Sequence, residues 1–147
     1  MYWGRLRADW DKGRGDANRR ALEKEMRAGH THALLAFAGD EPVGWCRVGP
    51  RESFPRLGKS RKLRRMQAPD ATWSVVCFFL RRDWRGKGVG RALLKAAAAY
   101  AFAQGAAGVE GYPVRPAASD KRLPDVFAWT GTRSLFEKAG FRPAPDS

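Results

Sequence analysis

The stretch "RGKGVG", residues 85–90, has a glycine at every second position and basic side chains around them. A glycine inside a regular element costs roughly 0.5–1 kcal/mol relative to alanine, so this spacing needs a reason. An apolar run at 72–80 precedes the stretch, and an alanine-rich segment at 89–104 follows it. A turn between a strand and a helix start binds anions, because the first helical N–H groups lack partners and the helix dipole is positive there. The pattern predicts a cradle for a phosphate or diphosphate, with positive charge added by Arg85, Lys87 and Arg91.

Two familiar phosphate loops do not match this turn. The Walker loop requires G-x-x-x-x-G-K-[ST], which the sequence does not contain. The dinucleotide fingerprint requires G-x-G-x-x-G, whereas Gly86 and Gly88 are followed directly by Gly90. The strand before the turn also lies too far along the chain to open a dinucleotide-binding fold. The turn is therefore a phosphate site of another kind.

The elements before the turn are a helix, a hairpin and a basic segment. Residues 16–28 predict an amphipathic helix with Asp16 as its N-cap and Gly29 at its end. Residues 33–38 and 43–48 predict a hairpin around the turn "AGDEP". Residues 51–65 carry seven basic residues and one acid, and predict a solvated, flexible and irregular loop that ends in a short helix.

The elements around and after the turn alternate between strand and helix. The run at 72–80 is apolar on both faces, which is typical of a central strand covered on both sides. Residues 89–104 predict a helix whose alanines permit close packing on the sheet, and 108–114 predict a second inner strand. A polar loop at 115–128 leads to a last helix at 130–140 with Gly140 as its C-cap glycine. This order of elements indicates a mixed α/β fold with helices packed on a sheet.

Two motifs together resemble the GNAT superfamily of N-acetyltransferases. The stretch from Arg85 to Gly90 matches Q/R-x-x-G-x-G/A, the pyrophosphate loop of that family, and "SLFEKAGF" at 134–141 is similar to its closing "LYEKxGF". The resemblance covers about 74–141, and residues 1–70 fit it loosely. It implies one domain over residues 1–147, with a mixed, mostly antiparallel sheet, helices on both faces, and acetyl-CoA bound where the central strands splay apart. Family members continue through further strands after this motif, so we expect a small sheet, a sheet completed by a partner chain, or a sequence shorter than the natural chain.

The resemblance also implies which residues bind acetyl-CoA. The backbone of residues 78–80 would hold the pantetheine arm, and one of its N–H groups would polarise the thioester carbonyl. The backbone and cations of the glycine turn would hold the pyrophosphate. The implied set is Phe78, Phe79, Leu80, Arg85, Gly86, Lys87, Gly88, Val89, Gly90 and Arg91.

The same reaction needs groups that move protons, because an alkyl ammonium is not a nucleophile. Glu110, on the strand after the long helix, matches a position where several family members place a base; Asp125 and a water relay are the alternatives. The family's usual acid, the tyrosine of "LYEK", is replaced by Phe136, so Tyr112 is the candidate acid unless the thiolate leaves unaided. Trp129 is a candidate for lining the acceptor pocket.

Composition narrows the classes of partner. The 147 residues carry a formal net charge of +13, which favours anionic partners, yet the basic segment 51–65 holds a single aromatic residue, so we do not expect a nucleic-acid partner. No apolar run reaches the roughly 18 residues of a membrane helix, and no secretion signal is visible. Cys46 and Cys77 lie in apolar runs, which predicts buried free thiols in a reducing cytoplasm. The two histidines have no companion ligands, so we expect no metal.

We therefore expect an acetyl-CoA-dependent N-acetyltransferase that acts on a primary amine by direct attack in a ternary complex. A homodimer is left open. The alternative is a non-catalytic module that binds acyl-CoA or nucleic acid.

Overall fold

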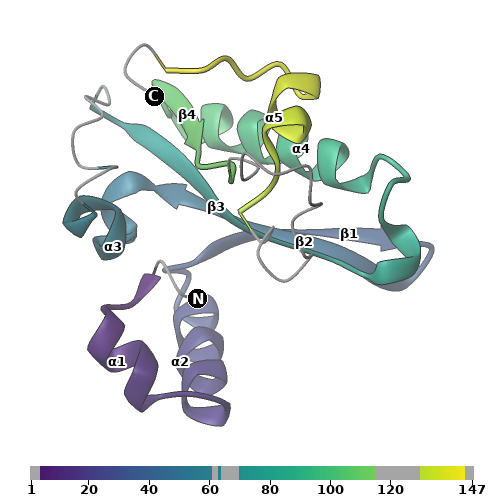
Figure 1. Ribbon diagram of the computed structural model, residues 1–147. Coiled ribbons are helices and arrows are strands. Elements are labelled where there is room, and N and C mark those ends of the chain that lie inside the picture. The colour runs from purple at the N-terminus through teal and green to yellow at the C-terminus, as the bar shows by residue number, and fades with distance from the viewer. Residues whose placement is uncertain (1–3, 61–62, 64–69, 115–129, 145–147) are drawn as a thin grey trace, which may run out of the picture.

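A four-stranded mixed sheet forms the centre of the molecule (Figure 1). The computed structural model describes residues 4–60, 63, 70–114 and 130–144. The strands follow chain order across the sheet: β1 (His32–Ala38), β2 (Glu41–Pro50), β3 (Thr72–Leu80) and β4 (Gly108–Gly111). The first two pairings are antiparallel, whereas β3 and β4 are parallel, because the chain returns between them through a helix.

Helices lie on both sides of this sheet, as the resemblance implied. In Figure 1, α4 (Val89–Ala103) and α5 (Arg133–Lys138) lie on one side, and α1 (Arg7–Lys12), α2 (Asp16–Arg27) and α3 (Pro55–Lys59) lie on the other. Two short 3-10 turns complete the described elements: η2 (Arg51–Ser53) follows β2, and η3 (Arg82–Trp84) follows β3. No helix of the described part of the chain is long and apolar enough to cross a membrane.

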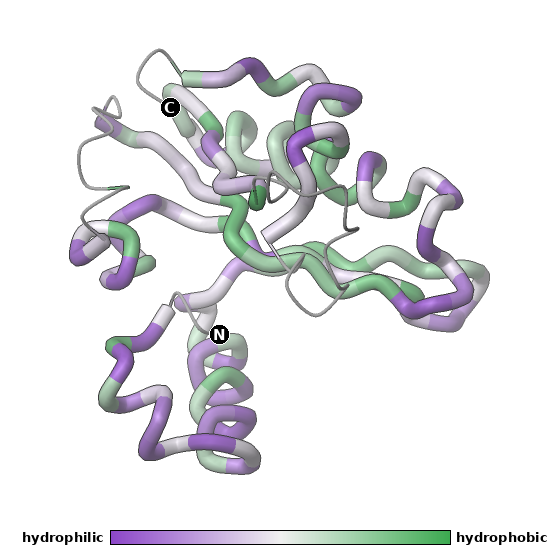
Figure 2. Tube along the Cα trace, viewed as in Figure 1, coloured by the Kyte–Doolittle hydropathy of each residue, from purple (hydrophilic) through white to green (hydrophobic). Residues whose placement is uncertain are grey.

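The strand β3 is buried on both faces, as its apolar sequence predicted. On one face, Trp73 and Val75 pack against the alanine-rich side of α4, around Leu94 and Ala97. On the other face, Val76 and Cys77 pack against Phe54 and Leu57 from the segment around α3. Figure 2 shows a stretch of hydrophobic residues along β2 and β3, whereas α1 and α2 carry many hydrophilic residues.

Both cysteines are buried and free, in agreement with the sequence analysis. Cys46 lies in the cluster under α4, and Cys77 lies in the cluster under α3. Burial raises the pKa of the Cys46 thiol from its ordinary 9.0 to about 12, and it also raises the pKa of Cys77. These thiols therefore behave as small apolar side chains.

Several expected details of the N-terminal half were wrong. The helix at 7–12 was not predicted, and Asp16 is the first residue of α2, not its N-cap; Gly15 precedes it with φ +81°. The segment 51–65 was expected to be a solvated loop, but in its described part Phe54 and Leu57 are at most 1% exposed, and a short helix spans Pro55–Lys59. Their burial is explained by the apolar face that β3 presents on the side away from α4. The end of the segment, where a short helix was expected, lies mostly outside the described residues.

The C-terminal elements are shorter than predicted. The strand expected at 108–114 ends at Gly111, and Val114 forms an isolated parallel bridge with Thr132. The last helix spans Arg133–Lys138, and Thr132 caps it by accepting a hydrogen bond from the Leu135 N–H at 3.4 Å. The predicted end at Gly140 is confirmed, since that residue follows the helix with φ +95°. The expected loop at 115–128, with Asp125, lies outside the described residues, as does Trp129.

Candidate functional site

A bulge divides β3 into two parts. Val48 of β2 pairs with Val75 and Arg47 pairs with Cys77, so Val76 is an extra residue in β3. Bulges bend a strand and redirect its side chains. As a result Val76 and Cys77 both pack on the α3 side, and the later residues Phe78 and Leu80 pack toward α4.

The second part of β3 has an open edge. β4 pairs with β3 only from Thr72 to Val75, although β3 continues to Leu80. Within the described residues, no strand pairs with this edge over residues 76–80. At the usual rise of about 3.3 Å per residue, the edge extends for about 13 Å. Phe78, Phe79 and Leu80, predicted to bind the pantetheine arm, lie along it, and Phe79 is 54% exposed.

The three glycines of the turn have two different structural reasons. Gly86 and Gly88 have φ of +74° and +85°, a region that side chains disfavour, and a Cβ on either would project into open space. Gly88 is the N-cap of α4, and no side chain of the described residues caps this helix start. Gly90 is buried in the first turn, where a Cβ would lie 3.3 Å from Leu80 Cδ1 and 3.5 Å from Leu135 Cδ1. The first two glycines leave room beside the helix start, and the third brings the helix close to β3.

The cations predicted around the turn are brought together there. Arg85, Lys87 and Arg91 are all exposed, and the first turn of α4 contains no acidic residue. The Arg85 Nε donates to the Leu80 carbonyl at 3.2 Å, which ties the turn to the end of β3. The Lys87 Nζ lies 5.1 Å from the centre of the Trp84 ring. Val89 instead packs against the core. The turn thus combines outward backbone N–H groups, a positive helix end and cations, the combination that an anion requires.

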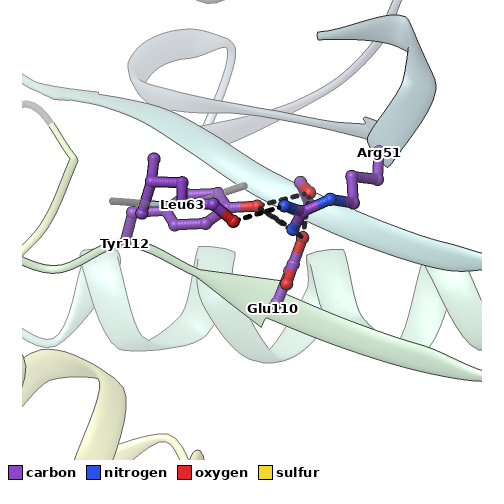
Figure 3. Close-up of polar contacts among 5 residues, drawn as sticks. Arg51, Leu63, Glu110 and Tyr112 are labelled. Atoms are coloured by element: carbon purple, nitrogen blue, oxygen red, sulfur yellow. Dashed lines mark hydrogen bonds and ion pairs between the residues drawn. The ribbon is translucent and has the colours of Figure 1, made fainter. Parts of the chain in front are cut away.

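At the other end of the open edge, Glu110 is the centre of a polar cluster (Figure 3). It lies on β4 directly opposite Ser74 of β3, and its side chain is 14% exposed. Its Oε1 accepts hydrogen bonds from Arg51 Nη1, from the Tyr112 hydroxyl and, at 2.9 Å, from Ser74 Oγ. Three donors thus converge on one carboxylate oxygen.

Arg51 and Tyr112 are also bonded to each other. Arg51 Nη1 donates to the Tyr112 hydroxyl at 3.0 Å, and its Nη2 donates to the Leu63 carbonyl at 2.9 Å. Burial, with the neighbouring Glu110 carboxylate as a second cause, raises the pKa of Tyr112 above its ordinary value. Its hydroxyl is therefore protonated at neutral pH.

Of the four side chains in this cluster, sequence reasoning singled out Glu110 and Tyr112 but not Arg51 and Ser74. Arg51 is separated from Glu110 by 59 positions and is one of several basic residues in its segment. Ser74 is a single small residue in an apolar run, 36 positions before Glu110. The pairing of β3 with β4 places Ser74 opposite Glu110, and the pairing of β2 with β3 brings Arg51, which follows β2, to the same place. No sequence signal marks either residue.

Phe136 occupies a packing position on the opposite face from Glu110. It is 4% exposed, and its ring lies 6.2 Å from that of Phe78 and 5.2 Å from that of Phe141. Its ring fills the space in which Gly111 would carry a Cβ. The aromatic ring is therefore held by the core at the point where β3 and β4 separate.

Comparison with known proteins identifies the family of this chain. The model of the acetyltransferase (GNAT) family matches residues 2–115. The chain belongs to this family. The match includes the N-terminal region, which the two motifs did not cover, and it ends before α5. No curated protein matches the sequence of this GNAT chain.

Solved structures of the family share the fold. AAC(6')-Iy in complex with the bisubstrate analogue CoA-S-monomethyl-acetylneamine has a TM-score of 0.59 and 17% identity, over 97% of this chain and 83% of that one. The aminoglycoside 6'-N-acetyltransferase AAC(6')-IG from Acinetobacter haemolyticus has a TM-score of 0.53 and 16% identity, over 97% and 83%. A ribosomal-protein-alanine N-acetyltransferase from Brucella melitensis biovar Abortus 2308 has a TM-score of 0.53 and 20% identity, over 97% and 85%. The mixed α/β fold of this GNAT chain was therefore predicted correctly.

Proposed function

We propose that this chain transfers the acetyl group of acetyl-CoA to a primary amine, by direct attack of the amine in a ternary complex. The observation that carries the proposal is the open edge of β3 over residues 76–80. The glycine turn lies at one end of this edge, and the pair Glu110 and Tyr112 lies at the other. A long ligand with a phosphate group at one end and a reactive group at the other matches this layout.

The residues present fit acetyl-CoA. A Cβ on Gly86 or Gly88 would enter the open space beside the start of α4, so the absence of side chains there keeps room for a diphosphate. Arg85, Lys87 and Arg91 would contribute positive charge to that site, together with the N–H groups from residues 86 to 91. The open edge from Phe78 to Leu80 would bind the pantetheine arm through backbone groups. When bound, acetyl-CoA supplies an activated acetyl thioester.

Glu110 and Tyr112 would move the protons of the reaction. In this proposal Glu110 accepts the proton that the amine loses, directly or through a water molecule, as the N–C bond forms. Tyr112 donates its proton to the leaving thiolate sulfur as the C–S bond breaks, and it takes a proton back from Glu110. The hydrogen bond between the two side chains supports this relay.

The relay also explains why Tyr112 would not act alone. The raised pKa makes its phenol a poor acid toward a thiolate, since thiols ordinarily have a pKa near 8.5. Only return of a proton from Glu110 would make the donation favourable. Asp125 and a water relay remain the alternative bases, and unaided departure of the thiolate is the alternative to Tyr112.

The acceptor is proposed only as a primary amine. The structural neighbours are named as acetyltransferases of aminoglycosides and of a ribosomal-protein alanine, and both kinds of acceptor are amines. The proposal also places a single domain over residues 1–147 in a reducing cytoplasm, where free thiols are usual. A homodimer stays open.

The test is a screen of primary amines that follows free thiol released from acetyl-CoA, with acetyl-CoA binding measured by calorimetry. The expected result is saturable binding, and thiol release that depends on both the amine and Glu110. Binding without turnover on small amines, aminoglycosides, peptide N-termini and lysine side chains would instead favour a non-catalytic acyl-CoA-binding module. This second candidate function is supported by Phe136, which stands at the family's usual tyrosine position and has no proton to donate to the leaving thiolate.

A further inference from the structure

Arg51 contacts both Glu110 and Tyr112, the two side chains that transfer protons in the proposed function. Its Nη1 donates to the Glu110 carboxylate and, at 3.0 Å, to the Tyr112 hydroxyl (Figure 3). Its Nη2 donates to the Leu63 carbonyl at 2.9 Å. We propose that Arg51 is a positioning residue for acetyl transfer, which holds Glu110 and Tyr112 as one hydrogen-bonded unit. This inference rests on the proposed function.

The geometry of the guanidinium is what makes this role specific. One nitrogen of its planar fork holds the two reacting side chains, and another is fixed to the backbone at Leu63. A lysine has a single ammonium nitrogen on a flexible stem, so it cannot span these partners in a fixed plane. Arg51 therefore does more than balance a charge, because it sets the distance and direction between Glu110 and Tyr112.

The contacts of Glu110 show how this positioning would act. Arg51, Tyr112 and Ser74 all donate to Oε1. Among the described residues none donates to the second oxygen, Oε2, which in this proposal accepts the proton from the amine. The positive charge of Arg51 also lies beside the Tyr112 oxygen, where it would stabilise negative charge that develops as the proton leaves.

The ion pair between Arg51 and Glu110 also lies in a position that suits a role at the site, and not only in the core. The side chains of Arg51 and Glu110 are 18% and 14% exposed, so the pair is shielded from water but not sealed in the core. Glu110 and Tyr112 flank Gly111, the last residue of β4 that pairs with β3. The unit that Arg51 holds together therefore lies where the open edge begins.

The experiment is a double-mutant cycle on the full chain. It compares Arg51→Met, Glu110→Gln and the double variant for turnover, with acetyl-CoA affinity by calorimetry and thermal unfolding as separate readouts. We expect Arg51→Met to lower kcat by roughly 10- to 100-fold without changing acetyl-CoA affinity, and Arg51→Lys to recover only part of that loss. In the Glu110→Gln background, Arg51→Met should change kcat by less than about threefold, because residues that act as a unit are not additive.

Arg47→Met is the matched control. Arg47 is a buried arginine on β2 of the same sheet, and like Arg51 it is paired with a glutamate, Glu25, at 3.4 Å. Arg47→Met should lower the stability of the fold. Any change that it causes in kcat should be of the same size in the parent and in the Glu110→Gln variant. If Arg51→Met does not fold, the cycle is built instead from Arg51→Lys, Glu110→Gln and the double variant Arg51→Lys/Glu110→Gln.

The outcomes separate the two levels of the proposal. A normal kcat for Glu110→Gln would refute the proton role of Glu110 in the proposed function. A large effect of Glu110→Gln, with an Arg51 effect of the same size in both backgrounds, would keep the proposed function and overturn the positioning role. Full recovery of kcat by Arg51→Lys would also overturn it, since charge alone would then be sufficient.

Discussion

Replacing Gly88 by glutamate is the most direct test of the anion site at the start of α4. Gly88 is the N-cap of this helix with φ +85°, and a Cβ there meets no atom within 4 Å. The new Cβ therefore meets none of the described residues, and the carboxylate is added beside the helix start, where the diphosphate would bind. We expect acetyl-CoA to bind at least tenfold more weakly, a loss of about 1.4 kcal/mol.

The cost in folding free energy is modest. A side chain in this left-handed region costs about 1–2 kcal/mol, whereas a negative charge at a helix N-terminus returns about 0.3–1 kcal/mol. The expected net loss is about 1 kcal/mol, which leaves a typical domain folded. Calorimetric titration with acetyl-CoA, after a thermal melt confirms folding, measures the effect on binding alone.

Gly105 provides a matched control at the other end of the same helix. Its φ is +87°, and a Cβ there also meets no atom within 4 Å. In Gly105→Glu the backbone strain is the same, but the carboxylate lies at the negative end of the helix dipole, so the two penalties add. Gly105→Glu should therefore lose more stability than Gly88→Glu and keep its acetyl-CoA affinity.

Gly88→Glu should thus be the more stable of the two variants but the weaker binder of acetyl-CoA, and Gly105→Glu should be less stable but bind normally. Unchanged acetyl-CoA affinity in folded Gly88→Glu would refute the assignment of the glycine turn as the diphosphate site. Equal losses of affinity in both variants would point to a general effect of strain on α4, and the local electrostatic argument would fail.

Four further predictions follow from individual side chains and from the overall charge. Glu110→Gln should lower turnover by roughly 10²–10⁴-fold at neutral pH and leave acetyl-CoA affinity intact, as steady-state kinetics and calorimetry would show; a parental pH–rate profile would contradict it. Phe136→Tyr should not raise turnover and should cost about 1–3 kcal/mol in denaturant unfolding, because its new hydroxyl enters a packed core; faster turnover would show that a missing acid limits the rate. The pKa of Cys46 is raised to about 12, so the unfolded chain loses this proton first: stability should be unaffected by this thiol below pH 9 and fall between pH 9 and 12, and Cys46→Ala should flatten that fall. Binding to DNA or RNA should be weak and lost at physiological salt, since the net charge of +13 supplies only sequence-independent attraction; tight, selective binding would favour the nucleic-acid module.

The parts of this fold that could be predicted from sequence are those with local causes. The run at 72–80 formed the central strand because its residues are apolar on both faces, and the segment from 89 formed a helix because its alanines pack closely on that strand. The glycine turn was recognisable because positive φ and close approach both leave the same mark in a sequence. The positive φ of Gly86 and Gly88 is a local property of the turn, whereas the close approach at Gly90 also involves Leu135 of α5.

The parts that could not be predicted depend on register and on distant contacts. The bulge at Val76 is invisible in an apolar run, yet it decides which side chains face α3 and which face α4. Phe54 and Leu57 are buried because they pack on the face of β3 that carries Val76 and Cys77. The sequence does not show this contact, so their basic segment was interpreted as a loop. Arg51 could not be distinguished from the other basic residues of that segment until the fold placed it beside Glu110.

The short pairing between β3 and β4 connects the two ends of the proposed site. If β4 paired with β3 as far as Leu80, the open edge would be filled by a strand and no backbone would be left for a ligand. Gly111 ends the pairing, and Phe136 packs into the space that its missing side chain leaves. The aromatic ring at the family's tyrosine position therefore supports the separation of the strands from the α5 side. In the proposed function, proton transfer is then assigned to groups on the other face, where Arg51, Glu110 and Tyr112 form one hydrogen-bonded unit.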